Sequence, residues 1–333
     1  MVPNAPSVAP RQRAPAARRR ALALLLAALP MLACQRGQPI GVMRPPPPLR
    51  ADSTALSFLV IGDWGRRGST NQRRVADAMD STARKLGADF VVTTGDNFYP
   101  NGVTSVGDDD WRASFENVYT GRALRTEWYA VLGNHDYRGD AQAQVDYSKG
   151  SRRWHLPARY YAVRERVDDS TSVELFFLDT NPFIAEYRRQ PRRYDDLVTQ
   201  DTAAQKRWLD SALTASTATW KLVVGHHHIY SGGKRDTSEE LERWLVPMME
   251  RHDVAAYVSG HEHVLQHVVR PLGRLHYFIS GAGSEVRSPG NALGTRYAEG
   301  RQGFMAVSVT NRELVVQAID FTGAVRYVTE LGR

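Results

Sequence analysis

Five short segments of the chain place a side chain that can bind a metal ion directly after a glycine. The side chains are carboxylates, imidazoles and an amide, and one segment adds a phenol. Carboxylate and phenolate oxygens suit a highly charged metal ion, whereas imidazole and a neutral amide suit a divalent one. One glycine–aspartate pair is an ordinary turn, but five segments of this kind predict a metal site. They are Gly62-Asp63-Trp64-Gly65, Gly95-Asp96-Asn97-Phe98-Tyr99, Gly133-Asn134-His135-Asp136, Gly225-His226 and Gly260-His261-Glu262-His263.

Each of these segments follows a short, nearly continuous apolar run. Runs of this length are typical of strands that are buried on both faces of a sheet. Two further runs of the same kind end at Asp179 and Gly281. The seven predicted strands cover residues 57–61, 90–94, 128–132, 173–178, 221–224, 254–259 and 275–280.

Three stretches between the strands predict helices, at residues 72–85, 202–216 and 239–251, because their apolar residues recur on one face. The predicted buried faces include Val75, Met79 and Thr82 in the first, Trp208, Leu209, Ala212 and Leu213 in the second, and Leu241, Trp244, Leu245 and Met248 in the third.

Strands that alternate with helices imply an α/β domain. In such sheets ligands bind beyond the carboxyl ends of the strands, which is where the polar segments should converge. The pattern changes after Gly303, where residues 304–309, 313–319 and 324–331 predict three consecutive antiparallel strands.

The ordered set of motifs resembles the purple acid phosphatases within the calcineurin-like metallophosphoesterases, and most of all their small, single-domain, tartrate-resistant type. The resemblance covers about residues 56–331 and implies a four-layer α/β/β/α sandwich of mixed sheets with flanking helices. It is specific because Tyr99 accompanies Asp96, and most other dimetal phosphoesterases lack a tyrosine there. Asp146-Tyr147-Ser148-Lys149 and Ser280-Gly281-Ala282-Gly283 also look like that type.

The resemblance implies a role for each ligand. Asp63, Tyr99 and His263 would bind a first metal, Fe³⁺, while Asn134, His226 and His261 would bind a second, Fe²⁺, Zn²⁺ or Mn²⁺. Asp96 would bridge the two ions. A metal-bound hydroxide would then attack small phosphate monoesters, as two ions about 3.5–4 Å apart allow.

Two further residues have expected roles in catalysis. The resemblance makes His135 an outer-sphere group that steadies the phosphate or protonates the leaving oxygen. The family usually has a second such histidine nine positions after the Gly-His ligand, and Arg235 stands there in this chain. We expect Arg235 to contact the substrate phosphate, since arginine binds anions but is a poor acid. The roles of His227 and His228 stay open.

Two alternative functions stay open at this point: a phosphodiesterase or nucleotidase that uses the same metals, and a non-catalytic surface protein that keeps the fold. Filled ligand positions argue against the second. The run of Arg188, Arg189, Arg192 and Arg193 predicts a solvated loop, with attraction of anionic substrates as the alternative.

The N-terminus is typical of an export signal. Residues 1–33 contain five arginines and no acid. Their final part, residues 21–33, is a short apolar segment directly before Cys34, the only cysteine. Cys34 resembles the lipidated residue of a bacterial lipoprotein, with ordinary cleavage near Ala33 as the alternative. Residues 34–55 form a Pro-rich linker, stiffened by four consecutive prolines. We therefore expect a periplasmic or cell-surface location, with membrane contact only through a lipid at Cys34.

The charge of the chain outside the leader is nearly balanced. The whole sequence has 43 basic and 36 acidic residues, so removing the five leader arginines leaves 38 against 36, a net charge of +2. Nothing in this balance indicates a nucleic-acid partner. We expect a monomer that acts on small phosphorylated molecules.

Overall fold

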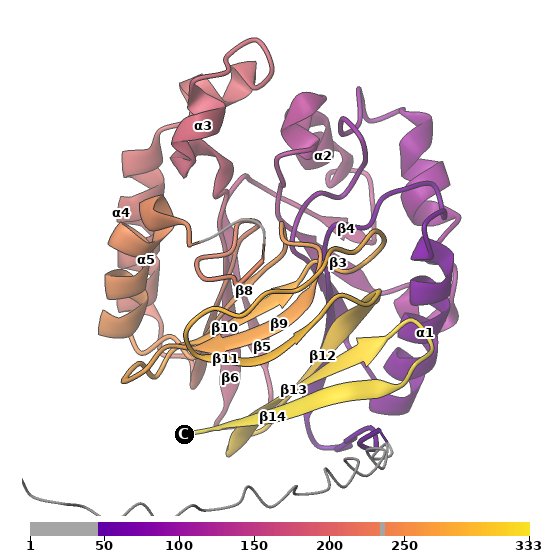
Figure 1. Cartoon of the computed structure of the whole chain (residues 1–333), viewed down its shortest axis with the longest axis vertical. Coiled ribbons are helices and arrows are strands. Elements are labelled where there is room, and N and C mark those ends of the chain that lie inside the picture. Colours follow the sequence, from indigo (N-terminus) through magenta and orange to yellow (C-terminus); the bar gives the residue numbers. More distant parts are fainter. Residues whose placement is uncertain (1–45, 234–236) are drawn as a thin grey trace, which may run out of the picture. The chain divides into compact units, whose positions relative to one another are not determined.

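The computed structural model describes residues 46–233 and 237–333. The predicted leader, Cys34 and Arg235 lie outside the described residues. The described chain contains two seven-stranded mixed sheets, with helices on their outer faces (Figure 1).

The first sheet has the strand order β14-β13-β12-β1-β2-β3-β4. Strands β1 to β4 run parallel to one another, and β12, β13 and β14 extend the sheet in antiparallel fashion from β1. Its strands are β1 (Leu56–Ile61), β2 (Phe90–Thr93), β3 (Glu127–Ala130), β4 (Trp154–His155), β12 (Gly303–Val309), β13 (Glu313–Asp320) and β14 (Val325–Gly332).

The second sheet has the strand order β11-β9-β10-β8-β7-β6-β5. Strands β6, β7, β8 and β10 are parallel, whereas β5, β9 and β11 pair with their neighbours in antiparallel fashion. Its strands are β5 (Tyr161–Arg166), β6 (Ser172–Phe177), β7 (Trp220–Val224), β8 (Ala256–Ser259), β9 (Leu265–Val269), β10 (His276–Ser280) and β11 (Thr295–Glu299).

The two sheets pack face to face through apolar side chains. Val60 and Met305 of the first sheet and Leu222 and Phe278 of the second line one small apolar gap between them. Helix α1 (Gln72–Leu86) covers the outside of the first sheet, and α4 (Thr202–Ala215) and α5 (Glu239–Arg251) cover the outside of the second (Figure 1). The predicted four-layer sandwich is therefore confirmed.

Shorter helices lie in the connections. They are α2 (Ala141–Tyr147), α3 (Ala185–Arg188), a π-helical turn (Trp111–Glu116) and 3₁₀ turns at Arg122–Leu124, Asp136–Arg138, Asn181–Phe183 and Asp195–Thr199. Helices α2 and α3 both lie at the end of the sheets where the carboxyl ends of β3 and β8 are found (Figure 1). Among the described residues, no helix combines the length and the apolar character needed to cross a membrane.

Local sequence explains where the longer helices begin and end. The Asp201 side chain accepts a hydrogen bond from the Ala204 amide and so caps the start of α4. Gly87 ends α1 with a φ of 65°, a left-handed conformation that glycine adopts without strain. In α5 the fully buried residues are Leu241, Leu245 and Met249, and the predicted Trp244 and Met248 are partly buried against the same core. Met249 completes the four-residue spacing that begins at Leu241.

Candidate metal centre

All seven predicted metal ligands lie in loops at the carboxyl ends of strands. The loops after β1, β2 and β3 supply the ligands from the first sheet, and those after β7 and β8 supply the ligands from the second. Each ligand is at most 6% exposed, so the donor atoms are removed from bulk water. The site is thus built jointly by both sheets. The predicted ligands are Asp63, Asp96, Tyr99, Asn134, His226, His261 and His263.

Three other predicted ligands, Asp63, Asp96 and His263, surround the Tyr99 hydroxyl. This oxygen lies 3.0 Å from Asp63 Oδ1, 2.9 Å from Asp96 Oδ2 and 3.1 Å from His263 Nε2. The His263 Nε2 atom is also 3.3 Å from Asp63 Oδ1. The predicted first set of donors is therefore convergent.

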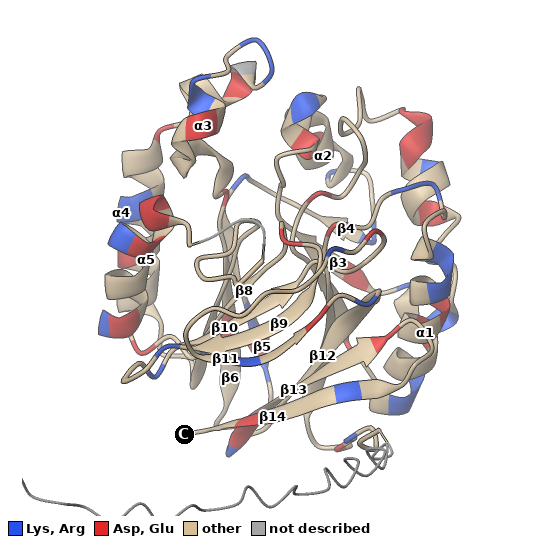
Figure 2. Ribbon diagram, viewed as in Figure 1, with Lys and Arg blue, Asp and Glu red and all other residues tan. Residues whose placement is uncertain are grey.

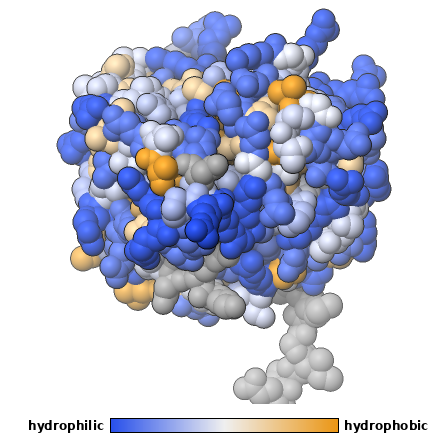
Figure 3. All heavy atoms as spheres, turned by 90° about the horizontal axis from the view of Figure 1, so that it is seen from above, coloured by the Kyte–Doolittle hydropathy of each residue, from blue (hydrophilic) through white to orange (hydrophobic). Residues whose placement is uncertain are grey.

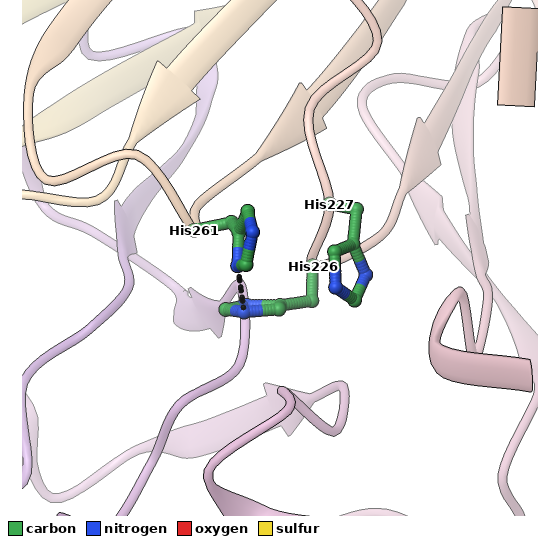
Figure 4. A group of neighbouring side chains, drawn as sticks. All are labelled: His226, His227 and His261. Carbon is green, nitrogen blue, oxygen red and sulfur yellow. Dashed lines mark hydrogen bonds between the residues drawn. The ribbon is translucent and has the colours of Figure 1, made fainter. Parts of the chain in front are cut away.

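A second group of donors gathers around His226. Its Nε2 atom lies 3.2 Å from Asn134 Oδ1, 3.1 Å from His261 Nδ1 and 3.5 Å from Asp96 Oδ1. Figure 4 shows the His226 and His261 rings meeting at these nitrogens. The His226 Nδ1–H donates to the Thr94 carbonyl at 2.9 Å, which leaves the lone pair of Nε2 directed at the other donors.

Asp96 lies between the two groups. Its Oδ2 faces Tyr99 and its Oδ1 faces His226. Burial tends to raise the pKa of the Asp96 carboxyl, but the neighbouring His226 and His135 outweigh this and lower it. A carboxylate that faces two donor groups through different oxygens is suited to bridge two cations.

His227 lies next to this site, and both of its ring nitrogens contact hydroxyl groups. Its Nδ1 is 2.8 Å from Thr180 Oγ1 and its Nε2 is 3.2 Å from the Tyr187 hydroxyl. The ring packs beside His226 and His261 in Figure 4. These contacts favour a supporting role for His227 over a ligand role, although its nitrogens lie close to those of His226 and His261.

Three predicted ligands have a left-handed backbone, which is unfavourable for residues with a side chain. The φ angles are 59° at Asp63, 50° at Asp96 and 68° at His261. Each such residue costs about 1–2 kcal/mol, so the surrounding contacts must enforce the conformation. The Asp63 amide donates to the Gly95 carbonyl at 3.0 Å, which ties the first two ligand loops together.

Glycines allow these loops to approach each other closely. A Cβ atom on Gly133 would overlap the amide nitrogen and Oδ1 of Asp96, and one on Gly260 would crowd Asp63 Oδ2. This close approach explains why glycine precedes ligands in two of the motifs.

Buried groups beneath the ligand loops hold them in place. Asp136 accepts hydrogen bonds from the amides of Gly133 at 2.7 Å and Asn97 at 3.0 Å, linking two of the loops. The Trp64 indole donates to Thr93 Oγ1 at 2.8 Å and packs against Phe98. In the third motif, Asp136 thus holds the loops together, whereas Asn134 lies among the donor groups of the site.

The donor set fits metal ions. Two carboxylates, a phenol, an amide and three imidazoles are buried within hydrogen-bond distance of one another, and carboxylates are costly to bury without compensating positive charge. Burial, with Asp63 and Asp96 nearby, raises the pKa of the Tyr99 phenol well above its usual value. The Arg66 guanidinium, 3.8 Å from the centre of that ring, opposes this shift.

His135 occupies the edge of the site. Its backbone amide donates to Asp96 Oδ1 at 2.7 Å, and its Nδ1 is 2.6 Å from the Pro100 carbonyl. A hydrogen bond to that carbonyl requires a proton on Nδ1 and leaves Nε2 on the Asp96 side, 4.0 Å from Oδ2. Burial lowers the pKa of His135, and Asp96 partly opposes this shift.

A cavity of about 510 Å³ adjoins the second donor group. Asn134 and His261 contribute to its wall, as do residues that the sequence did not mark as functional, including Arg138, Tyr187 and Tyr194. The strand pattern gives no signal for these. Arg138 lies in the 3₁₀ turn after the third motif, and Tyr187 and Tyr194 reach the cavity through the placement of α3 and the segment after it.

Comparisons with known proteins agree with this geometry. Residues 56–265 match the model of the calcineurin-like phosphoesterase family. The chain is 42% identical to purple acid phosphatase 3 of Arabidopsis thaliana over 289 residues, covering 84% of this chain and 78% of that protein. It is 33% identical to human tartrate-resistant acid phosphatase type 5, covering 84% of this chain and 91% of that protein.

The chain belongs to the purple acid phosphatases. It also shares its fold with the GAP50 anchor of the inner membrane complex of Plasmodium, with a TM-score of 0.74 and 23% identity over 84% of this chain and 89% of that one. Membership of the purple acid phosphatases confirms the predicted family. Together with the two groups of donors around Asp96, it indicates a site for two metal ions.

Proposed function

We propose that this purple acid phosphatase hydrolyses small phosphate monoesters with two metal ions. The observation that carries the proposal is the convergence of Asp63, Asp96 and His263 on the Tyr99 hydroxyl. The names of its relatives support the same reaction.

The donor chemistry supports different ions in the two groups. Asp63, Tyr99 and His263 with Asp96 would hold Fe³⁺, because phenolate and carboxylate oxygens are hard donors. Asn134, His226 and His261 with Asp96 would hold Fe²⁺, Zn²⁺ or Mn²⁺. When bound, the ions would neutralise the phosphate and activate the attacking water.

The protein's own groups position the substrate and move the proton. Asn134 and His261 line the cavity, so an ester with its phosphate beside them would extend its leaving group into that cavity. His135 keeps its Nδ1–H on the Pro100 carbonyl, so its doubly protonated form would donate the Nε2 proton to the leaving oxygen. Arg235 would hold the phosphate as a permanent cation.

The test combines activity with metal content. The purified protein should contain two metal ions per chain, absorb in the visible region and hydrolyse phenyl phosphate much faster than diphenyl phosphate. Faster cleavage of the diester would favour a phosphodiesterase instead. Two bound ions with no hydrolysis of either ester would favour a non-catalytic protein.

The location of the protein is a separate proposal, supported by the sequence of residues 1–34. We propose that the chain is exported and anchored through a lipid on Cys34, since stable attachment by acyl chains needs that thiol. Cys34→Ser should move the protein from the membrane fraction to the soluble fraction, as measured by fractionation and mass spectrometry of the N-terminus. Equal solubility of both forms, with lipid on neither, would show that Cys34 is incidental.

A further inference from the structure

We propose that the cavity beside Asn134 and His261 binds the leaving group of the substrate, and that Arg189 and Arg193 recognise a second anionic group on it. The preferred substrates would be phosphate monoesters whose leaving group carries another phosphate or a carboxylate. This inference rests on the proposed function, and it adds the class of substrate.

The cavity joins the candidate metal centre to the segment around α3. Its inner wall includes Asn134 and His261, and its outer wall includes Arg189 and Arg193. At about 510 Å³ it falls within the range of small-molecule sites, roughly 300–1,000 Å³. An ester with its phosphate at the inner wall therefore has room for a substantial leaving group. The remaining wall residues are Arg138, Ile184, Glu186, Tyr187, Gln190, Tyr194, His227, His228, Thr237, Ser238 and Glu240.

Three guanidinium groups supply the positive charge of this cavity. Among the residues that the structure describes, neither Arg189 nor Arg193 forms an ion pair. Arg138 donates to the Pro100 carbonyl and the Tyr194 hydroxyl, and no carboxylate of the described residues pairs with it. By contrast, Arg153 and Arg159 elsewhere in the fold are paired with carboxylates. The cavity arginines thus keep their charge available for an anion.

Two carboxylates also line the cavity, Glu186 and Glu240. The three arginines outnumber them, so the lining has a positive balance even before metal ions are added. Figure 2 shows basic residues in α3 and in the turn after it, and Figure 3 shows a largely hydrophilic surface when the molecule is seen from above. The surroundings therefore favour a polar, negatively charged leaving group over an apolar one.

Buried aromatic side chains fix the position of the arginine-bearing segment. Tyr187 and Tyr194 are almost fully buried and their ring centroids are 4.8 Å apart. The Tyr187 hydroxyl contacts His227 Nε2 at 3.2 Å, and Arg138 Nε donates to the Tyr194 hydroxyl at 3.4 Å. The predicted solvated loop is therefore only partly correct, because Arg188 ends a helical turn that Tyr187 anchors in the core.

Arg188 and Arg192, in the same basic segment, provide a matched control for Arg189 and Arg193. Arg189 and Arg193 line the cavity, whereas Arg188 and Arg192 do not, although all four are exposed. Replacing either pair by alanine removes the same charge from the same segment. A contact with the leaving group should depend on the first pair alone, while long-range attraction would depend equally on both pairs.

Two esters that differ only in a second anionic group can show whether the cavity recognises that group. Phenyl phosphate and 1,4-phenylene bisphosphate share the same ring, and the second carries an extra phosphate on the leaving side. The measured quantity is the ratio of kcat/KM for the bisphosphate, corrected for its two equivalent phosphates, to kcat/KM for phenyl phosphate. Calorimetric binding of the corresponding phosphonates, which cannot be hydrolysed, gives a readout that is independent of turnover.

The variant with Arg189→Ala and Arg193→Ala should lower this ratio by about fivefold or more, since losing one exposed charged contact costs roughly that factor. Affinity for the bisphosphonate should fall in parallel. The variant with Arg188→Ala and Arg192→Ala should keep the wild-type ratio. A carboxylate as the second anion is tested in the same way with 4-carboxyphenyl phosphate.

Two results would overturn the inference: an equal fall in the ratio for both double variants, or an unchanged ratio and bisphosphonate affinity in the first. The proposed function fails separately, through absence of phenyl phosphate hydrolysis by the wild-type protein, and the phosphonate binding comparison still tests the cavity in that case.

Discussion

The groups around Tyr99 determine whether its phenol carries a proton or binds a metal ion. The hydroxyl lies within 3.1 Å of two carboxylates and an imidazole, and the Arg66 guanidinium lies over the ring. The buried acidic groups keep the phenol protonated, and a cation in the same position would replace that proton. The side chain is thus suited to exchange a proton for a metal ion.

Replacing Tyr99 tests the nature of the first ion. Tyr99→Phe should abolish the visible colour while the protein stays folded, because a phenyl ring has no oxygen to donate charge to Fe³⁺. The visible spectrum together with far-ultraviolet circular dichroism checks this. Tyr129→Phe is the control, since that hydroxyl bonds Glu165 instead. A colourless wild-type protein with full iron content would refute the ferric assignment.

Asp96 is the residue whose loss should affect both ions. Asp96→Ala removes the carboxylate between the two donor groups and leaves two cations without a shared anion. We expect loss of at least one ion per chain and a fall in kcat of more than about 100-fold, since even groups behind the ligands cost 10–100-fold. Metal analysis and steady-state kinetics measure this. Asp109→Ala, at an exposed ion pair with Arg112, should have neither effect.

At the scale of elements, glycines decide whether the loops can meet. Gly133→Ala should push the loop after β3 away from Asp96, because the new methyl group would overlap the Asp96 backbone and carboxylate. Overpacking of this kind costs about 1–3 kcal/mol, so both the melting temperature and the metal content should fall. Gly150→Ala meets nothing within 4 Å and should leave both unchanged. Normal metal content in the Gly133 variant would show that the loop adapts.

The sequence predicts the strands that position the site and misses four others. Continuous apolar runs reveal β1, β2, β6 and β7 because both of their faces are covered. Strand β5 alternates between exposed residues and residues that are buried or half-buried, and β9 buries Gln266 and His267, so neither forms such a run. Strands β4 and β11 are short or only half-buried.

For the candidate site too, the sequence predicts the residues that depend on local structure and misses those that depend on the packing of distant segments. Motif spacing predicts the positions of the donor groups that converge in the structure, since each depends on a local strand and turn. Arg138, Tyr187 and Tyr194 carry no such signal, because their shared cavity depends on how distant segments pack.

For the whole molecule, the site links the two sheets. Asp63 and Asp96 follow strands of the first sheet, and His226 and His261 follow strands of the second, so bound metal should stabilise their packing against each other. Ions present at 100 times their dissociation constant add about 2.7 kcal/mol to the free energy of unfolding. Removing them with a chelator should lower the melting temperature in calorimetry, and restoring them should reverse it. The Asp96→Ala variant should respond less, and an unchanged wild-type melting temperature would contradict a link between the sheets.

The left-handed backbone at Asp63, Asp96 and His261 places stability and function in conflict. Glycine at Asp63 or Asp96 would relieve backbone strain and remove a buried carboxylate, yet it would delete a predicted ligand. Selection for a stable chain and selection for a working site therefore act in opposite directions at these positions. In a descendant freed from catalysis, these would be among the first positions to change.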